Sequence, residues 1–398
     1  MTRQLQDAYI VAATRTPVGK APRGAFRHTR PDSLLAHVLK QVLTQVPQIE
    51  LTRIDDVIVG CAMPEYEQGM NVARIGLLLA GLPNTVAGMT VNRFCSSGLN
   101  AVSIAADRIR TGEAEIMIAA GTESMSMIPM LGRLALNAEV FARDENLGIA
   151  YGMGLTAERV AERWNVSREE QDAFALASHR KALAAQAAGE FAEEISPYPI
   201  HENAPDLRSG KIVTRRRTLD RDEGPRADTS AEGLAKLKPV FAAKGSVTAG
   251  NSSQMSDGAG ASILVSERVL KELGLTPLVR WVGYAVAGVA PEVMGVGPIA
   301  AIPKLLGNTG IRQEEIDWIE LNEAFAAQSL AVIKELGLDP AKVNPQGGAI
   351  ALGHPLGATG AVRTATIVHG LRRHKLKYGM VTMCIGTGMG AAGIFESV

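Results

Sequence analysis

Short, almost continuously apolar runs alternate along this chain with longer segments of helical periodicity. Runs of this kind are typical of strands that are covered on both faces of a sheet. We expect such strands at residues 8–13, 56–60, 115–120, 261–265, 318–321 and 380–384. We expect helices at residues 33–46, 97–110, 323–336 and 357–373. This alternation predicts an α/β protein with a mostly parallel sheet.

The second half of the chain repeats the order of the first half. Cys95 opens one helix that is rich in small residues, and His354 opens another. Each helix leads to a strand that ends in a glycine-rich turn, at Gly121 and at Gly386. We interpret this as an internal duplication, with chance similarity between two α/β units as the alternative.

Residues 124–254 break the pattern and are rich in Ala, Glu, Arg and Pro. They include an amphipathic helix at 167–188 and a charged stretch at 211–226. We interpret them as an insertion into the first half, and most of those charges as a solvated face.

Composition excludes several classes of protein. The 398 residues have a formal net charge of zero, whereas nucleic-acid binders show a basic excess. The three cysteines, Cys61, Cys95 and Cys384, form neither a disulfide framework nor a zinc-binding spacing. No apolar run approaches the roughly 20 residues that a membrane span requires, and the first residues lack the core of a signal peptide. We therefore expect a cytoplasmic protein without membrane insertion and without a metal.

Cys95 lies between an apolar strand and a helix and is followed by Ser96, Ser97 and Gly98. A helix N-terminus offers free backbone N–H groups and the positive end of the helix dipole. Both favour a thiolate over a thiol, which predicts a nucleophile. The alternative is a buried structural cysteine.

Three further residues follow strands or open helices. His354 lies among five glycines between positions 344 and 360, and histidine accepts protons near neutral pH. The alternative is a structural turn with a capping histidine. Cys384 ends a strand before a Gly-x-Gly-x-Gly run, which suggests a second acid or base. Asn322 follows a strand and can hold a water in an oxyanion site or cap a helix.

These motifs together resemble the thiolase family, and the resemblance covers essentially the whole chain. It rests on the order and spacing of residues 15–20, 92–98, 121–126, 249–253, 322–325, 344–360 and 384–390. The resemblance implies two similar βαβαβαββ domains in a five-layered α-β-α-β-α core, with an inserted loop domain over the active site. The implied boundaries are 1–123 with 255–277 for the N-terminal domain, 124–254 for the CoA-binding loop domain and 278–398 for the C-terminal domain.

The resemblance also implies roles for the reactive residues. Cys95 would form the acyl-enzyme after His354 accepts its proton, and Cys384 would be the second acid and base. One oxyanion site would use His354 and a water held by Asn322. The other would use the backbone N–H groups of Cys95 and Gly386.

Coenzyme A enters this scheme as a substrate, and no resident cofactor is expected. The positions that match CoA-binding or acyl-pocket residues of the family are Arg226, Ala249, Ser253, Ala324, Phe325, Met153 and Met294. Short-chain biosynthetic members often carry a histidine where Gly152 stands and a glycine where Thr387 stands. Together with residues 252–258, these differences look more like the degradative 3-ketoacyl-CoA thiolases.

The resemblance therefore implies CoA-dependent cleavage of a 3-ketoacyl-CoA to acetyl-CoA and a shortened acyl-CoA. One alternative is a short-chain acetoacetyl-CoA thiolase. A β-ketoacyl synthase-like enzyme would place His or Asn at the position of Cys384, and a non-catalytic acyl-CoA or sterol carrier would be expected to lose the reactive residues. The expected partners are CoA and acyl-CoA thioesters, a second or further copies of the chain as a homodimer or homotetramer, and a β-oxidation dehydrogenase–hydratase subunit.

Overall fold

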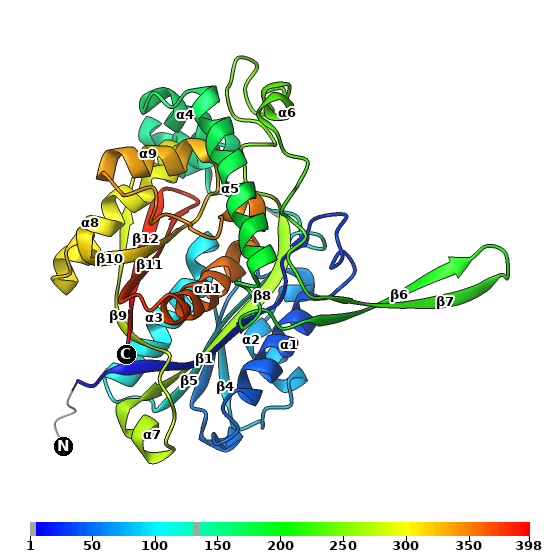
Figure 1. Ribbon diagram of the computed structural model, residues 1–398, viewed down its shortest axis with the longest axis vertical. Coiled ribbons are helices and arrows are strands. Elements are labelled where there is room, and N and C mark those ends of the chain that lie inside the picture. The colour runs from blue at the N-terminus through cyan, green and yellow to red at the C-terminus, as the bar shows by residue number, and fades with distance from the viewer. Residues whose placement is uncertain (1–4, 131–134) are drawn as a thin grey trace.

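The computed structural model describes residues 5–130 and 135–398. One long sheet runs through the molecule (Figure 1). Helices cover its outer faces, and two further helices lie between its two halves. The strands of this sheet are β1 (Ala8–Arg15), β2 (Gly19–Lys20), β3 (Asp56–Gly60), β4 (Ala87–Val91), β5 (Ile116–Ser124), β8 (Ser256–Ser266), β9 (Val279–Gly288), β10 (Ile316–Leu321), β11 (Tyr378–Ile385) and β12 (Met389–Ser397). The helices that pack on it are α1 (Pro31–Thr44), α2 (Val72–Leu79), α3 (Ser97–Arg110), α7 (Glu267–Glu272), α8 (Gly297–Thr309), α9 (Ala326–Leu336) and α11 (Thr359–Arg373). The short helix α10 (Ala349–Leu352) packs instead against α5 (Arg168–Ala188).

The sheet is two copies of one strand order joined at β1 and β9. The first half runs β4-β3-β5-β8-β1, and the second runs β10-β11-β12-β9. In chain order, β9, β10, β11 and β12 repeat β1, β3, β5 and β8. A parallel bridge between Ile319 of β10 and Val343 occupies the place that β4 has beside β3. This repeated order agrees with the predicted duplication.

Hydrogen bonds of individual side chains are also repeated between the two halves. Asp55 precedes β3, and its carboxylate accepts the N–H groups of Glu115 and Ile116 at the start of β5, at 2.7 and 3.0 Å. Asp317 at the start of β10 accepts the N–H groups at the start of β11 in the same way.

The prediction of a mostly parallel sheet is wrong. Only the pairs β3–β4, β3–β5 and β10–β11 are parallel, and the remaining pairs of the sheet are antiparallel. The connection between β11 and β12 shows the reason. It is a tight turn in which Thr387 and Gly388 have φ angles of 70° and 92°, and a turn this short can join only antiparallel strands.

Helices and the two halves of the sheet alternate in five layers, α-β-α-β-α, and three apolar clusters hold these layers together. Val57 and Val59 of β3 face α1 and α2, whereas Ile58 faces the central helices α3 and α11. On the second half of the sheet, Trp318 and Val381 face the same central helices. The opposite face of that half packs on α8 and α9. Because side chains alternate along a strand, each half of the sheet is buried on both faces.

The central helices α3 and α11 touch through glycines near their first turns. A Cβ on Gly98 would lie 2.5 Å from the backbone nitrogen of Ala361, and one on Gly360 would lie 2.1 Å from that of Leu99. Only glycine permits this approach. The N-termini of the two helices, and hence the segments that precede them, therefore meet between the two halves of the sheet.

Residues between β5 and β8 form the predicted insertion, since β5 and β8 themselves pair. Its elements are α4 (Met153–Arg163), α5 (Arg168–Ala188), β6 (Tyr198–Asp206), β7 (Lys211–Leu219) and α6 (Ala231–Ala235). The helices gather at one end of the molecule, at the top of the view, while the β6–β7 hairpin projects away from the body (Figure 1). Much of the charged stretch at 211–226 is thus an exposed strand, β7. Among the described residues, no helix has the length and apolarity that crossing a membrane demands.

Candidate active site

Cys95 lies in a 3₁₀ turn, Phe94–Ser96, directly before α3. The backbone N–H groups of Gly386 and of Cys95 itself point at its sulfur. A Cβ on Gly386 would lie 3.8 Å from both the Met153 sulfur and the Phe94 ring, so these two side chains lie beside Gly386. The structure therefore joins two predicted site residues from opposite halves of the chain.

Burial, and to a smaller extent the charge of Glu123, raise the pKa of the Cys95 thiol, the two N–H groups lower it, and the net result is a pKa of about 11. The backbone N–H groups favour the thiolate, as expected for a helix N-terminus, but the pKa is raised overall. The reason is that loss of hydration disfavours the charged form more strongly than the N–H groups stabilise it.

Cys384 lies at the end of β11 and is fully buried. Burial and the nearby Cys95 raise the pKa of its thiol, in line with the contact between β11 and the turn that carries Cys95. The apolar cluster around Cys384 contains Met294, Ala324 and Phe325, with Met153 packed against it. Four predicted pocket residues thus line the wall of the site at the second thiol.

His354 is held by hydrogen bonds on both ring nitrogens. Its Nε2 is 3.3 Å from the Asn322 amide nitrogen, and its Nδ1 is 2.6 Å from Thr359 Oγ. Its backbone N–H also lies 3.0 Å from Ser256 Oγ. Burial, and then the charge of Arg363, lower the pKa of His354 to about 3. The imidazole is therefore neutral near pH 7 and can accept a proton.

The two groups of reactive residues meet at the junction of α3 and α11. The turn that carries Cys95 contacts both β11, which ends at Cys384, and the turn Leu356–Ala358 that follows His354. Asn322 joins from β10, because its N–H donates to Thr382 of β11 at 2.9 Å. The Asn322 Oδ1 atom is buried and has no hydrogen-bond partner among the described residues, so this amide oxygen remains available within the site.

The predicted CoA-binding residues fall into two groups. The N–H of Ser253 donates to the carbonyl of Ala324 at 2.9 Å, which places Ser253 beside the wall of the site. Ala249 is exposed nearby in the same loop. Arg226 is exposed and pairs with Asp228 at 3.0 Å, outside the cluster around the thiols.

Several functional contacts were missed from the sequence. Thr359 and Ser256 both bind His354, and the buried carboxylates of Glu123 and Glu323 bind backbone near it. All four lie within or beside the motifs that define the resemblance. Their positions were therefore visible in the sequence, but their hydrogen-bond partners depend on the fold.

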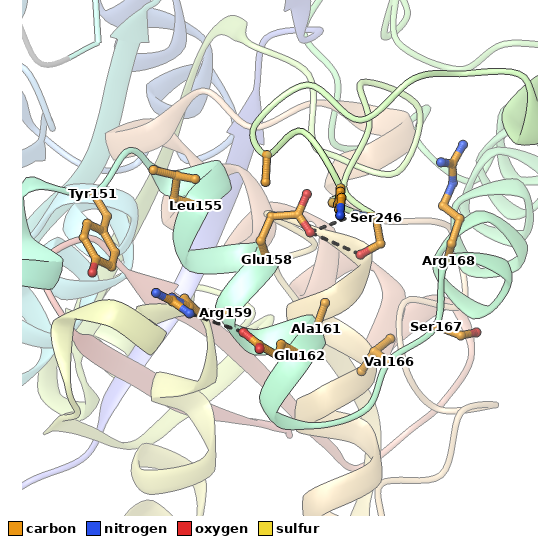
Figure 2. Close-up of a pocket in the computed structure, with 13 residues that line it drawn as sticks. Tyr151, Leu155, Glu158, Arg159, Ala161, Glu162, Val166, Ser167, Arg168 and Ser246 are labelled. Atoms are coloured by element: carbon orange, nitrogen blue, oxygen red, sulfur yellow. Dashed lines mark hydrogen bonds and ion pairs between the residues drawn. The ribbon is translucent and has the colours of Figure 1, made fainter.

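A separate surface cavity of about 730 Å³ lies between α4 and residues 242–246 of the insertion (Figure 2). Glu158 reaches across its edge and accepts the N–H of Ser246 at 2.9 Å (Figure 2). None of the predicted site residues lines this cavity. Within residues 5–130 and 135–398, no group of three or more His, Cys, Asp or Glu side chains could hold a metal ion.

Models of a known protein family match almost the whole of this chain. The model of the thiolase N-terminal domain matches residues 8–268, and that of the thiolase C-terminal domain matches residues 275–397. The chain belongs to the thiolase family. The predicted resemblance and the predicted thiolase fold are thereby confirmed, and thiolases are acyltransferases that act on CoA thioesters.

Individual thiolases are similar over almost their full length. A 3-ketoacyl-CoA thiolase of Bacillus subtilis is 48% identical over 98% of this chain and 100% of its own. The peroxisomal 3-ketoacyl-CoA thiolase A of Mus musculus is 46% identical over 98% of this chain and 91% of its own. The crystal structure of the acetyl-CoA acetyltransferase of Bacillus anthracis superposes with a TM-score of 0.88 at 40% identity and full coverage of both chains.

Proposed function

We propose that this thiolase cleaves 3-ketoacyl-CoA with CoA, giving acetyl-CoA and an acyl-CoA shortened by two carbons. The observation that carries the proposal is the meeting of two thiols, the half-buried Cys95 and the fully buried Cys384, with the amide of Gly386. The similarity to proteins named 3-ketoacyl-CoA thiolase supports this substrate class.

In the first half-reaction, His354 accepts the proton of Cys95 as the sulfur attacks the keto carbon. The carbon–carbon bond then breaks, the shortened acyl group stays on Cys95, and Cys384 protonates the departing acetyl-CoA enolate. In the second half-reaction, Cys384 takes the proton of free CoA, whose thiolate removes the acyl group from Cys95, and His354 returns its proton to the departing Cys95 thiolate. These two half-reactions start from a neutral His354 and a protonated Cys95.

Two oxyanions develop along this path. We assign one to the N–H groups of Cys95 and Gly386, because both already point at the sulfur position. We assign the other to His354 and a water held by Asn322, whose Oδ1 is free to accept a hydrogen bond. Removal of one such donor costs on the order of 3 kcal/mol of activation free energy.

CoA is a substrate in this scheme. We propose that residues 124–254 form the loop domain that covers it, with Arg226 near its nucleotide end and Ala249 and Ser253 along its pantetheine. We assign residues 1–123 with 255–277 and residues 278–398 to the two core domains. We expect the protein to be located in the cytoplasm. Because the mouse relative is named as peroxisomal, cell fractionation is the test of this location.

The test has two parts. Acetyl-CoA without free CoA should acetylate Cys95, and intact-mass and peptide analysis would locate the group. A thiolysis assay over 3-ketoacyl-CoA chain lengths would then distinguish this activity from that of an acetoacetyl-CoA thiolase. An acetyl group on Cys384, or on neither cysteine, would contradict the assigned roles.

A further inference from the structure

Two carboxylates are buried beside the site without a cationic partner among their hydrogen-bond donors. Glu123, at the end of β5, is 1% exposed. It accepts the N–H groups of Ala62 at 2.8 Å, Met63 at 3.3 Å and Gly357 at 2.9 Å, and the side-chain amide of Gln68. All four donors are neutral, so the carboxylate is satisfied only while these groups keep their positions.

Glu323 is the second such carboxylate, two residues beyond the end of β10, and it is also 1% exposed. It accepts Ser178 Oγ at 2.7 Å, the Asn344 amide at 2.8 Å and the N–H of Ile350 at 3.2 Å. These donors are neutral as well. The two glutamates therefore stand at the carboxyl ends of β5 and β10, one in each half of the sheet.

Both glutamates bind the backbone of the segment that carries His354. Ile350, held by Glu323, lies four residues before the histidine, and Gly357, held by Glu123, lies three residues after it. Glu123 also fixes Ala62, against whose backbone Gly357 packs: a Cβ on Gly357 would lie 2.4 Å from the Ala62 nitrogen. The segment is thus tied on both sides of His354 to strands of the sheet, β10 through Glu323 and β5 through Glu123.

We propose that Glu123 and Glu323 are positioning residues that hold His354 at the distance from Cys95 that proton transfer requires. The inference rests on the proposed function of those two residues. Neither glutamate touches the reacting atoms, and each acts through backbone N–H groups. A glutamine has the same shape, but its NH₂ group would face an N–H donor where an acceptor is needed.

Glu123 has a second effect that Glu323 lacks. Its negative charge lies close enough to Cys95 to raise the pKa of that thiol. Neutralising Glu123 should therefore make Cys95 more reactive toward a simple alkylating agent. The same change should slow the acetylation of Cys95, because His354 is no longer held in position to accept its proton. A change that only loosened the structure would not produce these opposite effects.

The experiment compares Glu123→Gln, Glu323→Gln and Asp55→Asn in the full chain. Asp55 is the control because its carboxylate also accepts two backbone N–H groups, but at the far end of β5. We expect both glutamine variants to acetylate Cys95 10- to 100-fold more slowly, with little change in KM for acetyl-CoA, as for a misplaced catalytic group. At pH 8, iodoacetamide should alkylate Cys95 faster in Glu123→Gln and at an unchanged rate in Glu323→Gln and Asp55→Asn.

Three outcomes would overturn the inference. These are acetylation at the unmodified rate in both glutamine variants, an equal loss of rate in Asp55→Asn, or slower alkylation in Glu123→Gln. If Glu123→Gln does not fold, the acetylation rate of Glu323→Gln decides. If the unmodified protein is not acetylated at Cys95, the proposed function fails instead. The alkylation comparison would still report separately whether the Glu123 charge reaches Cys95.

Discussion

Cys95 experiences opposing electrostatic effects from its own surroundings. Burial and Glu123 favour the protonated thiol, while the N–H groups of Cys95 and Gly386 favour the thiolate, and the net result is a pKa of about 11. His354, with a pKa of about 3, is neutral at the same pH. Because neither group is charged at rest, the proton has to move to His354 as the sulfur attacks, and the distance between the two groups controls the rate.

This resting state predicts the pH dependence of chemical modification. Below its pKa, the thiolate fraction of a thiol increases about tenfold per pH unit, and the thiolate is the form that reacts. We therefore expect the rate of Cys95 alkylation by iodoacetamide in the free protein to keep rising from pH 7 to pH 10. Stopped assays with peptide mass spectrometry measure it, with Cys95→Ser as the blank. A plateau at or below pH 8 would show that the resting thiol is already ionised.

The second thiol can be tested by separating the two half-reactions. Cys384→Ala should still be acetylated at Cys95 by acetyl-CoA, although more slowly, because His354 remains and CoA can leave as a thiolate without a proton from Cys384. Condensation of two acetyl-CoA molecules should fall by about 10²- to 10⁴-fold, because the base that removes the α-proton is lost. Cys61→Ala, another fully buried cysteine, is the matched control and should keep both steps. Equal loss of both steps in Cys384→Ala would indicate a structural role.

The sequence revealed the reactive residues more readily than those that hold them. Cys95 and His354 open helices beside glycines, a local pattern that needs no knowledge of the fold. Thr359 bonds to His354 across a single turn, yet Glu123 reaches Gly357 from a position 234 residues away. Contacts of that second kind exist only after the two halves of the sheet have come together.

At the scale of elements, the prediction worked where both faces of a strand carry large apolar side chains. The predicted strand at 56–60 has the bounds of β3, and the predicted helix at 97–110 has those of α3. β12 was missed because its start, Gly390 to Gly393, consists of Gly and Ala, which have low strand propensity. β6 and β7 were missed because they are largely exposed and stabilise mainly each other. The helix predicted from 323 begins instead at Ala326, since the preceding residues pair with 251–253.

Gly152, directly before α4, is the basis for a prediction about the length of the acyl chain that the protein prefers. Gly152 is the N-cap of α4, it is exposed, and a Cβ placed on it would meet no atom within 4 Å. A histidine therefore fits there without strain and would add bulk beside Met153. We expect the unmodified protein to gain efficiency from the four-carbon 3-ketoacyl-CoA to medium chains, because each buried methylene contributes up to ~0.8 kcal/mol.

Gly152→His should lower activity on medium chains more than on acetoacetyl-CoA. The measurement is kcat/KM over a series of chain lengths. Gly307→His is a suitable control, because Gly307 is an equally open glycine on the surface of α8. Activity confined to acetoacetyl-CoA in the unmodified protein would contradict the prediction and leave the catalytic residues unaffected.

At the scale of the whole molecule, the sheet has an edge at β4. Among the residues that the structure describes, β4 is paired on one side only, with β3, and its residues are partly or fully exposed, including Met89 at 39%. An unpaired strand edge of this kind pairs readily with another chain, and a two-fold axis would continue the sheet into a second copy. We expect a dimer or a dimer of dimers.

Multi-angle light scattering at micromolar concentration should give at least twice the mass of one chain. Met89→Lys should shift the protein toward the monomer, because a lysine on a strand edge disfavours pairing. Leu207→Lys, on the projecting hairpin where Leu207 is 92% exposed, should leave the mass unchanged. A stable monomer of the unmodified protein would reject the predicted assembly.

The position of β1 has a consequence for how the chain folds during synthesis. β1 is synthesised before the other strands of this sheet, yet it pairs with β8, Ala8 opposite Ser266, and with β9, Tyr9 opposite Arg280. Contacts of such high sequence separation form slowly, and until β8 arrives both β1 and β5 have unpaired edges. A nascent chain that stalls within the insertion therefore exposes two apolar strands to aggregation. The insertion lengthens this interval, so the polypeptide should depend on chaperones until residue 266 has emerged.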